Sequence, residues 1–395
     1  MTENKDSKET GGKDLNKTDK KDLKETKTKD LKELASLFLR LGVTAFGGPA
    51  VHIAMMQKEV VDRRKWMTHQ HFLDLLGATQ LIPGPNSTEM AIHIGQERGG
   101  WRGLLVAGAC FILPAVFITG IIAWLYQVYG QLPVVSAWMV GMKPAIIAVI
   151  LGAVYPLAKK AFSNSWLLIL GVAVLVASLM GANELAVMFG AGGIMLLIRW
   201  VRQSGNTLKG FLPMVLLQSP TVVESNARIF FIFLKIGALL YGSGYVLFAF
   251  LDNELVTTGL LSRRQLTDAI AIGQFTPGPV FSAVTFIGWQ MSGWKGAILA
   301  TLGVFLPSFL FVALLNPLLG WMRRSGPFSA FLDGVNAAAI ALVLSVCITL
   351  GQEVIGDWRT VLIGLLSLAV VFGRPKLNSA FIILGGMMLG YILQL

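Results

Sequence analysis

The sequence predicts an all-α polytopic membrane protein made of two inverted-topology repeats, each with about five spanning helices plus a re-entrant helical hairpin broken at Pro-Gly-Pro. Three observations lead to this prediction. Of the 395 residues, 54% are hydrophobic and only 14% are charged, with a mean hydropathy of +0.65, which is too apolar for a soluble globular chain. A helix-breaking tripeptide occurs twice, and the two halves of the chain match one another.

The tripeptide lies at Pro83–Pro85 and at Pro277–Pro279, each time inside an apolar segment and three residues after a glutamine. Two prolines and a glycine do not continue a helix. At membrane depth, unpaired backbone groups persist only where they face protein or a watery cavity. Two such breaks at matching places indicate a transporter built from repeats.

The halves align over several blocks with small gaps between them. Phe38–Gly42 matches Phe233–Gly237 at an offset of 195, Gln80 and its tripeptide match Gln274 and its tripeptide at 194, and Trp101–Gly103 matches Trp294–Gly296 at 193. Two diverged copies of one domain produce this pattern.

Four parts are predicted along the chain: a disordered charged tail at 1–33, a first transporter repeat at 34–202, a cytoplasmic linker at 203–225, and a second, inverted repeat at 226–395. The tail alternates lysine with acidic residues and threonine, so it cannot bury a core. It is too long and too acidic to begin a cleavable signal peptide. Cys110 and Cys347 lie in apolar segments without metal-ligand spacing, so we expect packing roles.

Basic residues set the expected orientation. Apolar segments of the first half cover 34–57, 69–96, 100–129, 133–158, 164–181 and 184–200. Lys and Arg cluster at 63–65, 98–102, 159–160 and 199–202, which the positive-inside rule places in the cytoplasm. Both ends of segment 69–96 then lie inside. This segment is therefore expected to be a re-entrant hairpin, which leaves five crossings in the half.

Because the first half crosses the membrane an odd number of times, the second copy is expected to have the opposite orientation, and its basic residues agree with this. Arg323, Arg324, Arg374 and Lys376 all fall on the cytoplasmic side if this copy is upside down. Both chain termini would then lie outside, although a hairpin at Phe46–Pro49 would move the N-terminus inside. Inverted repeats hold their substrate near the bilayer midplane, between the ends of broken helices.

Several runs of the first half carry a family resemblance: Arg40–His52, Glu59 with Arg63–Trp66, Gln80–Ser87 and Gly95–Arg98. Together they resemble the chromate ion transporter family in its long two-domain form, over about residues 34–395. The resemblance implies a multi-pass transporter of the bacterial plasma (inner) membrane that carries chromate, with sulfate as the look-alike oxyanion. It also implies an efflux role in chromate resistance and opposite orientations of the two halves.

The second copy departs from the first at polar positions. Lys235 replaces Arg40, Gly244 stands where Pro49 does, and Val280 and Phe281 replace Asn86 and Ser87. The polar chemistry of the two halves is therefore unequal.

A divalent oxyanion needs positive charge, and three cations lie in apolar segments. Arg40 and Lys235 occupy the same repeat position, and Lys143 precedes Pro144. Cations inside the membrane are costly and mark function by default. Arg can give an oxyanion two parallel hydrogen bonds, whereas Lys acts as a point charge. We expect all three to contact substrate, with snorkelling to the interface as the alternative.

The helix breaks supply further donors. Gly47, Gly48, Gly84 and Gly278 would expose backbone amides at the starts of half-helices, whose positive ends favour anions. Asn86 and Ser87 follow the first tripeptide, where they could cap the next half-helix or bind the ion. Gln80 and Gln274 could donate to the ion or bond to carbonyls freed at the broken turn.

Proton coupling requires a group that titrates, and the candidates are His52, Glu59, Glu89 and His93. Glu59 lies beside Lys58, Arg63 and Arg64, so an ion pair in a loop is its preferred role, ahead of proton coupling. Glu89 and His93 are one turn apart on the half-helix after the break and share a face. They are therefore the preferred proton relay.

No enzyme activity, cofactor or metal site is expected. Reduction of chromate would need a cofactor or paired thiols, and the chain has only four histidines. The expected partners are chromate or sulfate, protons or a counter-anion as coupling ion, and the lipid bilayer, without nucleic acid; a homodimer is left open. The preferred function is secondary active chromate transport. The alternatives are an oxyanion uptake permease and an anion channel, which would not need titratable coupling residues.

Overall fold

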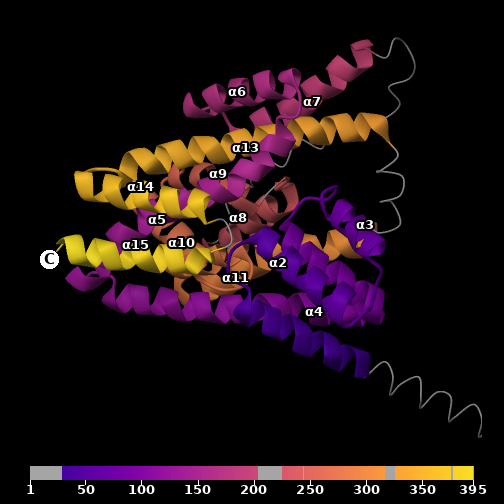
Figure 1. The fold of residues 1–395 in the computed structure, drawn as a ribbon, viewed down its shortest axis with the longest axis horizontal. Helices are drawn as coiled ribbons and strands as arrows, with labels where there is room; N and C mark the ends of the chain where they lie inside the picture. The colour runs from indigo at the N-terminus through magenta and orange to yellow at the C-terminus, as the bar shows by residue number, and fades with distance from the viewer. Residues whose placement is uncertain (1–28, 203–224, 243, 316–324, 375–376, 395) are drawn as a thin grey trace, which may run out of the picture.

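The computed structural model describes residues 29–202, 225–242, 244–315, 325–374 and 377–394, and within these ranges the chain is helical, without strands (Figure 1). The expected linker at 203–225 and tail at 1–33 lie largely outside the described residues. The helices of the first half are 29–44, α2 (Pro49–Gln57), η1 (Lys58–Arg63), α3 (His69–Thr79), α4 (Asn86–Tyr129), α5 (Pro133–Ala161), α6 (Ser165–Leu179) and α7 (Glu184–Arg202).

The second half has the same order of elements. Its helices are α8 (Ser225–Leu239), η2 (Gly244–Val246), α9 (Leu247–Leu251), η3 (Asp252–Val256), α10 (Arg263–Phe275), η4 (Val280–Ser282), α11 (Ala283–Leu315), α13 (Gly326–Val354), α14 (Trp358–Gly373) and α15 (Ser379–Gln394). α5 and α13 begin and end at the same positions once 193 is subtracted. Both halves also place a π-helical turn, η1 or η3, before the helix that leads to the tripeptide.

Five helices in the described part of the chain are long and apolar enough to cross a membrane: Asn86–Tyr129, Pro133–Ala161, Glu184–Val201, Val280–Leu314 and Gly326–Val354. Shorter apolar helices are Ser165–Leu179, Trp358–Gly373 and Ser379–Leu393. At about 1.5 Å per residue, the 15 residues of α6 span less than the roughly 30 Å of a bilayer core. The chain is therefore a helical membrane protein with helices of unequal length.

α4 contains a chain reversal at Gly100, which has φ 58° and ψ −148°. A Cβ on Gly95 would meet the backbone of Gly103, whereas eight residues of straight helix would separate these positions by about 12 Å. The same close approach joins Gly288 to Gly296 around the reversal at Gly293 in α11. Glycine is required at these contacts because a side chain would separate the backbones.

The N-terminal helix starts at residue 29, so residues 29–33, expected in the tail, are helical instead. Arg98 pairs with Asp30 at 2.7 Å and lies 4.9 Å from the ring centre of Trp66. The first helix therefore begins beside the basic 63–65 cluster. The helix is interrupted at residues 45–48, so the expected single segment 34–57 is two helices. The described residues therefore contain the break at Phe46–Pro49 on which the hairpin alternative depends.

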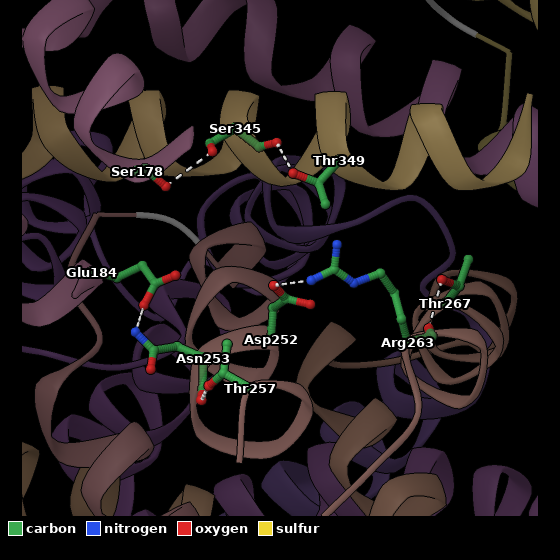
Figure 2. Close-up of polar contacts among 9 residues, drawn as sticks. All are labelled: Ser178, Glu184, Asp252, Asn253, Thr257, Arg263, Thr267, Ser345 and Thr349. Atoms are coloured by element: carbon green, nitrogen blue, oxygen red, sulfur yellow. Dashed lines mark hydrogen bonds and ion pairs between the residues drawn. The ribbon is translucent and has the colours of Figure 1, made fainter. Parts of the chain in front are cut away.

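Helices of one half pack mainly on helices of the other. α13 contacts α6 and α7, and α5 contacts α14 and α15. Ser178 of α6 bonds to Ser345 of α13 at 2.9 Å (Figure 2). At the matching place, a Cβ on Gly152 of α5 would meet Val371 of α14. Pairs of equivalent contacts therefore join the two halves across a wide, largely apolar interface.

We expect Gly84→Ala to destabilise the protein by about 2–4 kcal/mol, from backbone strain and overpacking. Gly84 has φ 138°, and an added Cβ would meet the Glu89 carboxylate and the Ser308 hydroxyl. Thermal unfolding of the purified protein in detergent measures the effect. Gly120→Ala is the matched control, because Gly120 lies inside α4 with nothing within 4 Å of its added Cβ. Equal unfolding temperatures for the two variants would contradict the strain at Gly84.

Candidate functional site

Four helix breaks meet at the centre of the protein, two from each half. The Gly84 N–H donates to the Leu240 carbonyl at 2.7 Å, and the Gly278 N–H donates to the Ala45 carbonyl at 2.8 Å. Each tripeptide glycine thus bonds to the carbonyl that ends the first helix of the opposite half. The two bonds are equivalent, since Ala45 and Leu240 are 195 residues apart and the glycines 194.

Half-helices begin at these breaks without side-chain caps. α2 follows Gly48, α4 follows Pro85 and η4 follows Pro279, and none of these N-cap residues makes a side-chain hydrogen bond to its helix. The first backbone N–H groups of a helix have no partner within the helix, and they carry a partial positive charge. Several positive helix ends therefore lie around the crossing of the two halves.

A cavity of about 210 Å³ lies beside the first tripeptide. Its lining residues are Gln80, Asn86, Leu157, Lys160, Ala161, Ser163, Leu167, Gly242, Asp333, Asn336 and Ile340. Both halves contribute, and three of the lining side chains are neutral amides. Since a water molecule occupies about 30 Å³ in the liquid, the cavity has room for a small oxyanion with some of its hydration shell.

Two of the predicted ligands, Gln80 and Asn86, line this cavity, whereas Ser87 does not. Ser87 Oγ lies 3.4 Å from His52 Nδ1, and His52 Nε2 lies 3.1 Å from the Ala45 carbonyl oxygen. Ser87 and His52 are both buried. This contact connects the start of α4 to α2 and to the carbonyl that accepts from Gly278.

The predicted glycines lie at close approaches between the halves. A Cβ on Gly48 would lie 2.6 Å from the Tyr245 hydroxyl, and one on Gly278 would lie 2.8 Å from Cβ of Ala115. Gly47 is in contact with its own half-helix through Val51, while Gly242, its equivalent in the second half, lines the cavity. The glycines therefore let the backbones approach.

Arg40 and Lys235 form equivalent ion pairs. Arg40 contacts Glu59 and Lys235 contacts Glu254, both at 2.7 Å, and the acids are 195 residues apart like the cations. Glu59 also pairs with Arg63 at 2.7 Å and with Arg64 at 3.4 Å. The structure therefore places both predicted cations on carboxylates, at the ends of the first helices rather than in the cavity.

Lys143 of α5 pairs with Asp268 of α10 at 2.7 Å. The Tyr126 hydroxyl of α4 donates to the second carboxylate oxygen of Asp268. Gln274, six residues further along α10, is buried, and its Nε2 has no hydrogen-bond partner among the described residues. The helix that leads to the second tripeptide thus carries an ion pair with α5.

Glu89 lies in a fully buried position on α4, just after the first tripeptide. In the described part of the chain, neither of its carboxylate oxygens has a hydrogen-bond partner, and the Ser308 hydroxyl beside Gly84 has none either. His93, one turn later, is also buried. A carboxylate charge without a partner is costly to bury, so this position calls for a proton or a cation.

Sequence reasoning missed Asp268, Asn336 and Lys160 as site residues. Asp268 had a detectable signal, because it precedes Gln274 by six residues, as Asp74 precedes Gln80. Lys160 lies in the α5–α6 turn region and reaches the cavity only through the fold. Of the expected coupling residues, Glu59 is at the basic end of the protein, and His52, Glu89 and His93 are near the crossing.

A second polar region lies where η3 meets α7 and α10. Figure 2 shows Arg263 bonded to Asp252 and Asn253 bonded to Glu184. Asp252 and Arg263 are 3.1 Å apart. Burial raises the pKa of Asp252, and Arg263 opposes this effect. The equivalent region of the first half, at η1, is basic, so the two halves differ most in charge at these ends.

Replacing Glu59 with glutamine is expected to destabilise the protein by about 1–3 kcal/mol at neutral pH, because three arginines lose their counter-charge. Burial alone would raise the pKa of Glu59, but hydrogen bonds from Arg63, Arg40 and Arg64 and the charge of Arg40 lower it below its usual 4.5. The stabilisation is therefore complete above about pH 4.5 and is lost as the pH falls through the lowered pKa.

Unfolding temperatures of the wild type and Glu59→Gln, measured from neutral to acidic pH, check this expectation. The two curves should converge only below about pH 4.5. Glu97→Gln is the control, because Glu97 is 41% exposed and pairs only with the partly exposed His71 in the described residues. A gap between wild type and Glu59→Gln that persists unchanged into acid would contradict the role of the carboxylate charge.

Comparison with known proteins identifies the family. The model of the family described as "Chromate transporter" matches residues 32–197 and again 227–391. A chromate transport protein of Cupriavidus metallidurans is 32% identical over 369 residues, covering 91% of this chain and 92% of that protein. A probable chromate transport protein of Synechococcus elongatus is 31% identical over 348 residues, covering 85% and 88%. No solved structure matches. With both halves matched by one model and most of the chain aligned to these relatives, this protein belongs to the chromate transporter family.

Proposed function

We propose that this protein is a secondary active transporter that carries chromate across the bacterial plasma membrane, with the cavity between the broken helices as its binding site. The observation that carries the proposal is the cavity itself, which is lined from both halves and lies beside the first tripeptide. The names of the relatives, chromate transport proteins in two bacteria, supply the substrate.

The two halves, 34–202 and 226–395, are proposed as inverted repeats, each with a re-entrant hairpin at its tripeptide. Three features support this arrangement. The elements recur at offsets of 193 to 195, and the tripeptide hydrogen bonds are reciprocal. In Figure 1, α4 ends and α5 begins at the end of the molecule where α13 ends and α14 begins, so α5 and α13 run in opposite directions. Such repeats place their substrate at the repeat interface.

The cavity is proposed to open to the cytoplasm. Lys160 and Ser163, near the α5–α6 turn, line it, and basic turns face the cytoplasm in membrane proteins. The equivalent side of the second half is occupied by the Lys143–Asp268 pair. One open side and one closed side are what an inward-facing state of a transporter with alternating access would have.

The cavity offers the chemistry that a tetrahedral dianion requires. Lys160 supplies positive charge, which the Asp333 carboxylate in the same lining opposes. The amides of Gln80, Asn86 and Asn336 supply donors, and the uncapped start of α4 supplies backbone N–H groups. Chromate and sulfate share this geometry, so we propose sulfate as a second substrate. Efflux, with chromate resistance as its result, is the proposed direction. Arg40 and Lys235 are already paired with acids, so we propose that they hold the helix ends.

The proposed coupling ion is a proton or a counter-anion. Glu89 is the preferred proton carrier in the first half, because the buried carboxyl group of Glu89 makes no hydrogen bond within the described residues. His93 lies one turn away. An anion channel and an uptake permease are the competing functions. A channel would conduct without saturation and without exchange of one oxyanion for another.

Proteoliposomes that contain the purified protein test the transport function. We expect saturable uptake of labelled chromate or sulfate, stimulated by a proton gradient or by the other oxyanion inside the vesicles. If only the proton gradient or only the internal oxyanion stimulates uptake, that result identifies the coupling ion. Flux that does not saturate would favour the channel, and no flux of either ion under any gradient would overturn the proposal.

The binding site is tested by Asn86→Leu, which replaces an amide in the cavity wall with an apolar side chain of similar volume. We expect the half-saturating chromate concentration to rise by about tenfold, the effect of losing a hydrogen bond to a charged group. Gln70→Leu is the matched control, because Gln70 is exposed on α3 and does not line the cavity. Equal half-saturating concentrations for both variants and the wild type would exclude Asn86 from the site.

A further inference from the structure

The Lys143–Asp268 ion pair joins the two halves of the protein beside the second tripeptide. Lys143 Nζ lies 2.7 Å from Asp268 Oδ1, and the side chains are only 15% and 2% exposed. The pair connects α5 of the first half to α10 of the second half. Tyr126 of α4 adds a hydrogen bond to the same carboxylate. A buried carboxylate in this setting is stable only while it has a cationic partner or a proton.

The repeat equivalents of this pair lie in a different setting. Asn336, at the position of Lys143, lines the open cavity. Asp74, at the position of Asp268, is exposed on α3 and bonds to the neighbouring Gln70. Asn336 therefore lines a cavity, whereas Lys143, its repeat equivalent, is held in an ion pair with the opposite half.

We propose that the Lys143–Asp268 pair is the closed gate of the transport pathway, and that the transported dianion opens it by replacing the Asp268 carboxylate on Lys143 while Asp268 takes up one proton. This inference rests on the proposed function. The carboxylate occupies the place on Lys143 that an oxyanion oxygen takes in the open state.

The exchange balances in charge and in protons. In the closed state the pair has no net charge. In the open state Lys143 holds the dianion and Asp268 is neutral, so one dianion and one proton are bound together, with a net change of −1. On release of the dianion to the other side, Asp268 loses its proton to the same side and returns to Lys143. The proton therefore travels with the anion, in the same direction.

Few other ionisable groups approach Asp268 in the described part of the chain. Tyr126 comes from α4 and Lys143 from α5. Arg264 lies on α10 itself, and Asp252 of η3, which also packs against α10, pairs with Arg263. Tyr126 can donate to the ionised carboxylate and accept from the protonated one, so it can bond to Asp268 in both states.

Proteoliposomes with a trapped pH-sensitive dye test this coupling. Chromate or sulfate is added outside at alkaline pH, where both are dianions, with no pH gradient and with the membrane potential clamped. For the wild type we expect anion uptake to acidify the lumen. For Asp268→Asn we expect anion uptake with one proton fewer per anion, because the proton that Asp268 takes up is lost while Glu89 is unchanged. Asp74→Asn, the equivalent change in the first half, should acidify the lumen like the wild type.

Lys143→Gln with Asp268→Asn is a second variant, which leaves no unpaired buried charge if Asp268→Asn alone does not fold. It should transport with the same reduced acidification per anion and with a half-saturating anion concentration raised by about tenfold or more, because a charge-assisted contact is lost. Acidification per anion at the wild-type level in either variant would overturn the proposal, as would wild-type uptake without acidification. Absence of any wild-type uptake would instead count against the proposed transport function.

Discussion

The structure depends on two reciprocal backbone hydrogen bonds, from Gly84 to Leu240 and from Gly278 to Ala45. Each tripeptide breaks its helix and so frees backbone groups at a depth where lipid cannot satisfy them. Each half supplies a hydrogen-bond partner to the other, because the carbonyl at the end of one half's first helix accepts from the tripeptide glycine of the other half. A half alone would leave these groups unpaired, so the breaks require two copies in contact. Positive φ at Gly84 and Gly278 allows the approach.

This dependence explains why the site lies where it does. Helix breaks that satisfy one another must meet, and where they meet, the half-helix ends and their polar neighbours gather in an apolar protein. The cavity then forms from whatever polar side chains follow the break. In the first half these are Asn86 and the more distant Lys160, whereas in the second half Val280 and Phe281 are buried and the Lys143–Asp268 pair lies beside the break. Unequal side chains on matching backbones therefore give a cavity in one place and an ion pair in the other.

The sequence predicted the helical class, the tripeptide breaks and the matching halves because these depend on composition, proline and spacing. It also predicted Gln80 and Asn86 as substrate ligands from their distance to the break. Both line the cavity, and their contact with substrate stays a prediction. It predicted that Arg40 and Lys235 bind the substrate, because a cation in an apolar segment needs a partner. The sequence could not identify the partner in the fold. Glu59 and Glu254 are 19 residues further along the chain, and only the hairpin at each first break brings them back. The start of the first helix at residue 29 was missed because Asp30 and Glu33, which pair with Arg98, resemble the charged tail.

An internal repeat shows which positions of the two halves are equivalent, but it does not show which contacts each position makes. The equivalence of Lys143 with Asn336 was visible in the sequence, yet it could not indicate that one position is closed by Asp268 and the other lines a cavity. That difference requires a partner from the opposite half, since Asp268 reaches Lys143 only after α10 packs against α5. A transporter that alternates between two states needs contacts that hold one side shut and can be exchanged. In the proposed alternating mechanism the reciprocal glycine bonds would form the fixed axis, because the same bond is present in both halves. An ion pair present on only one side suits the part that must open.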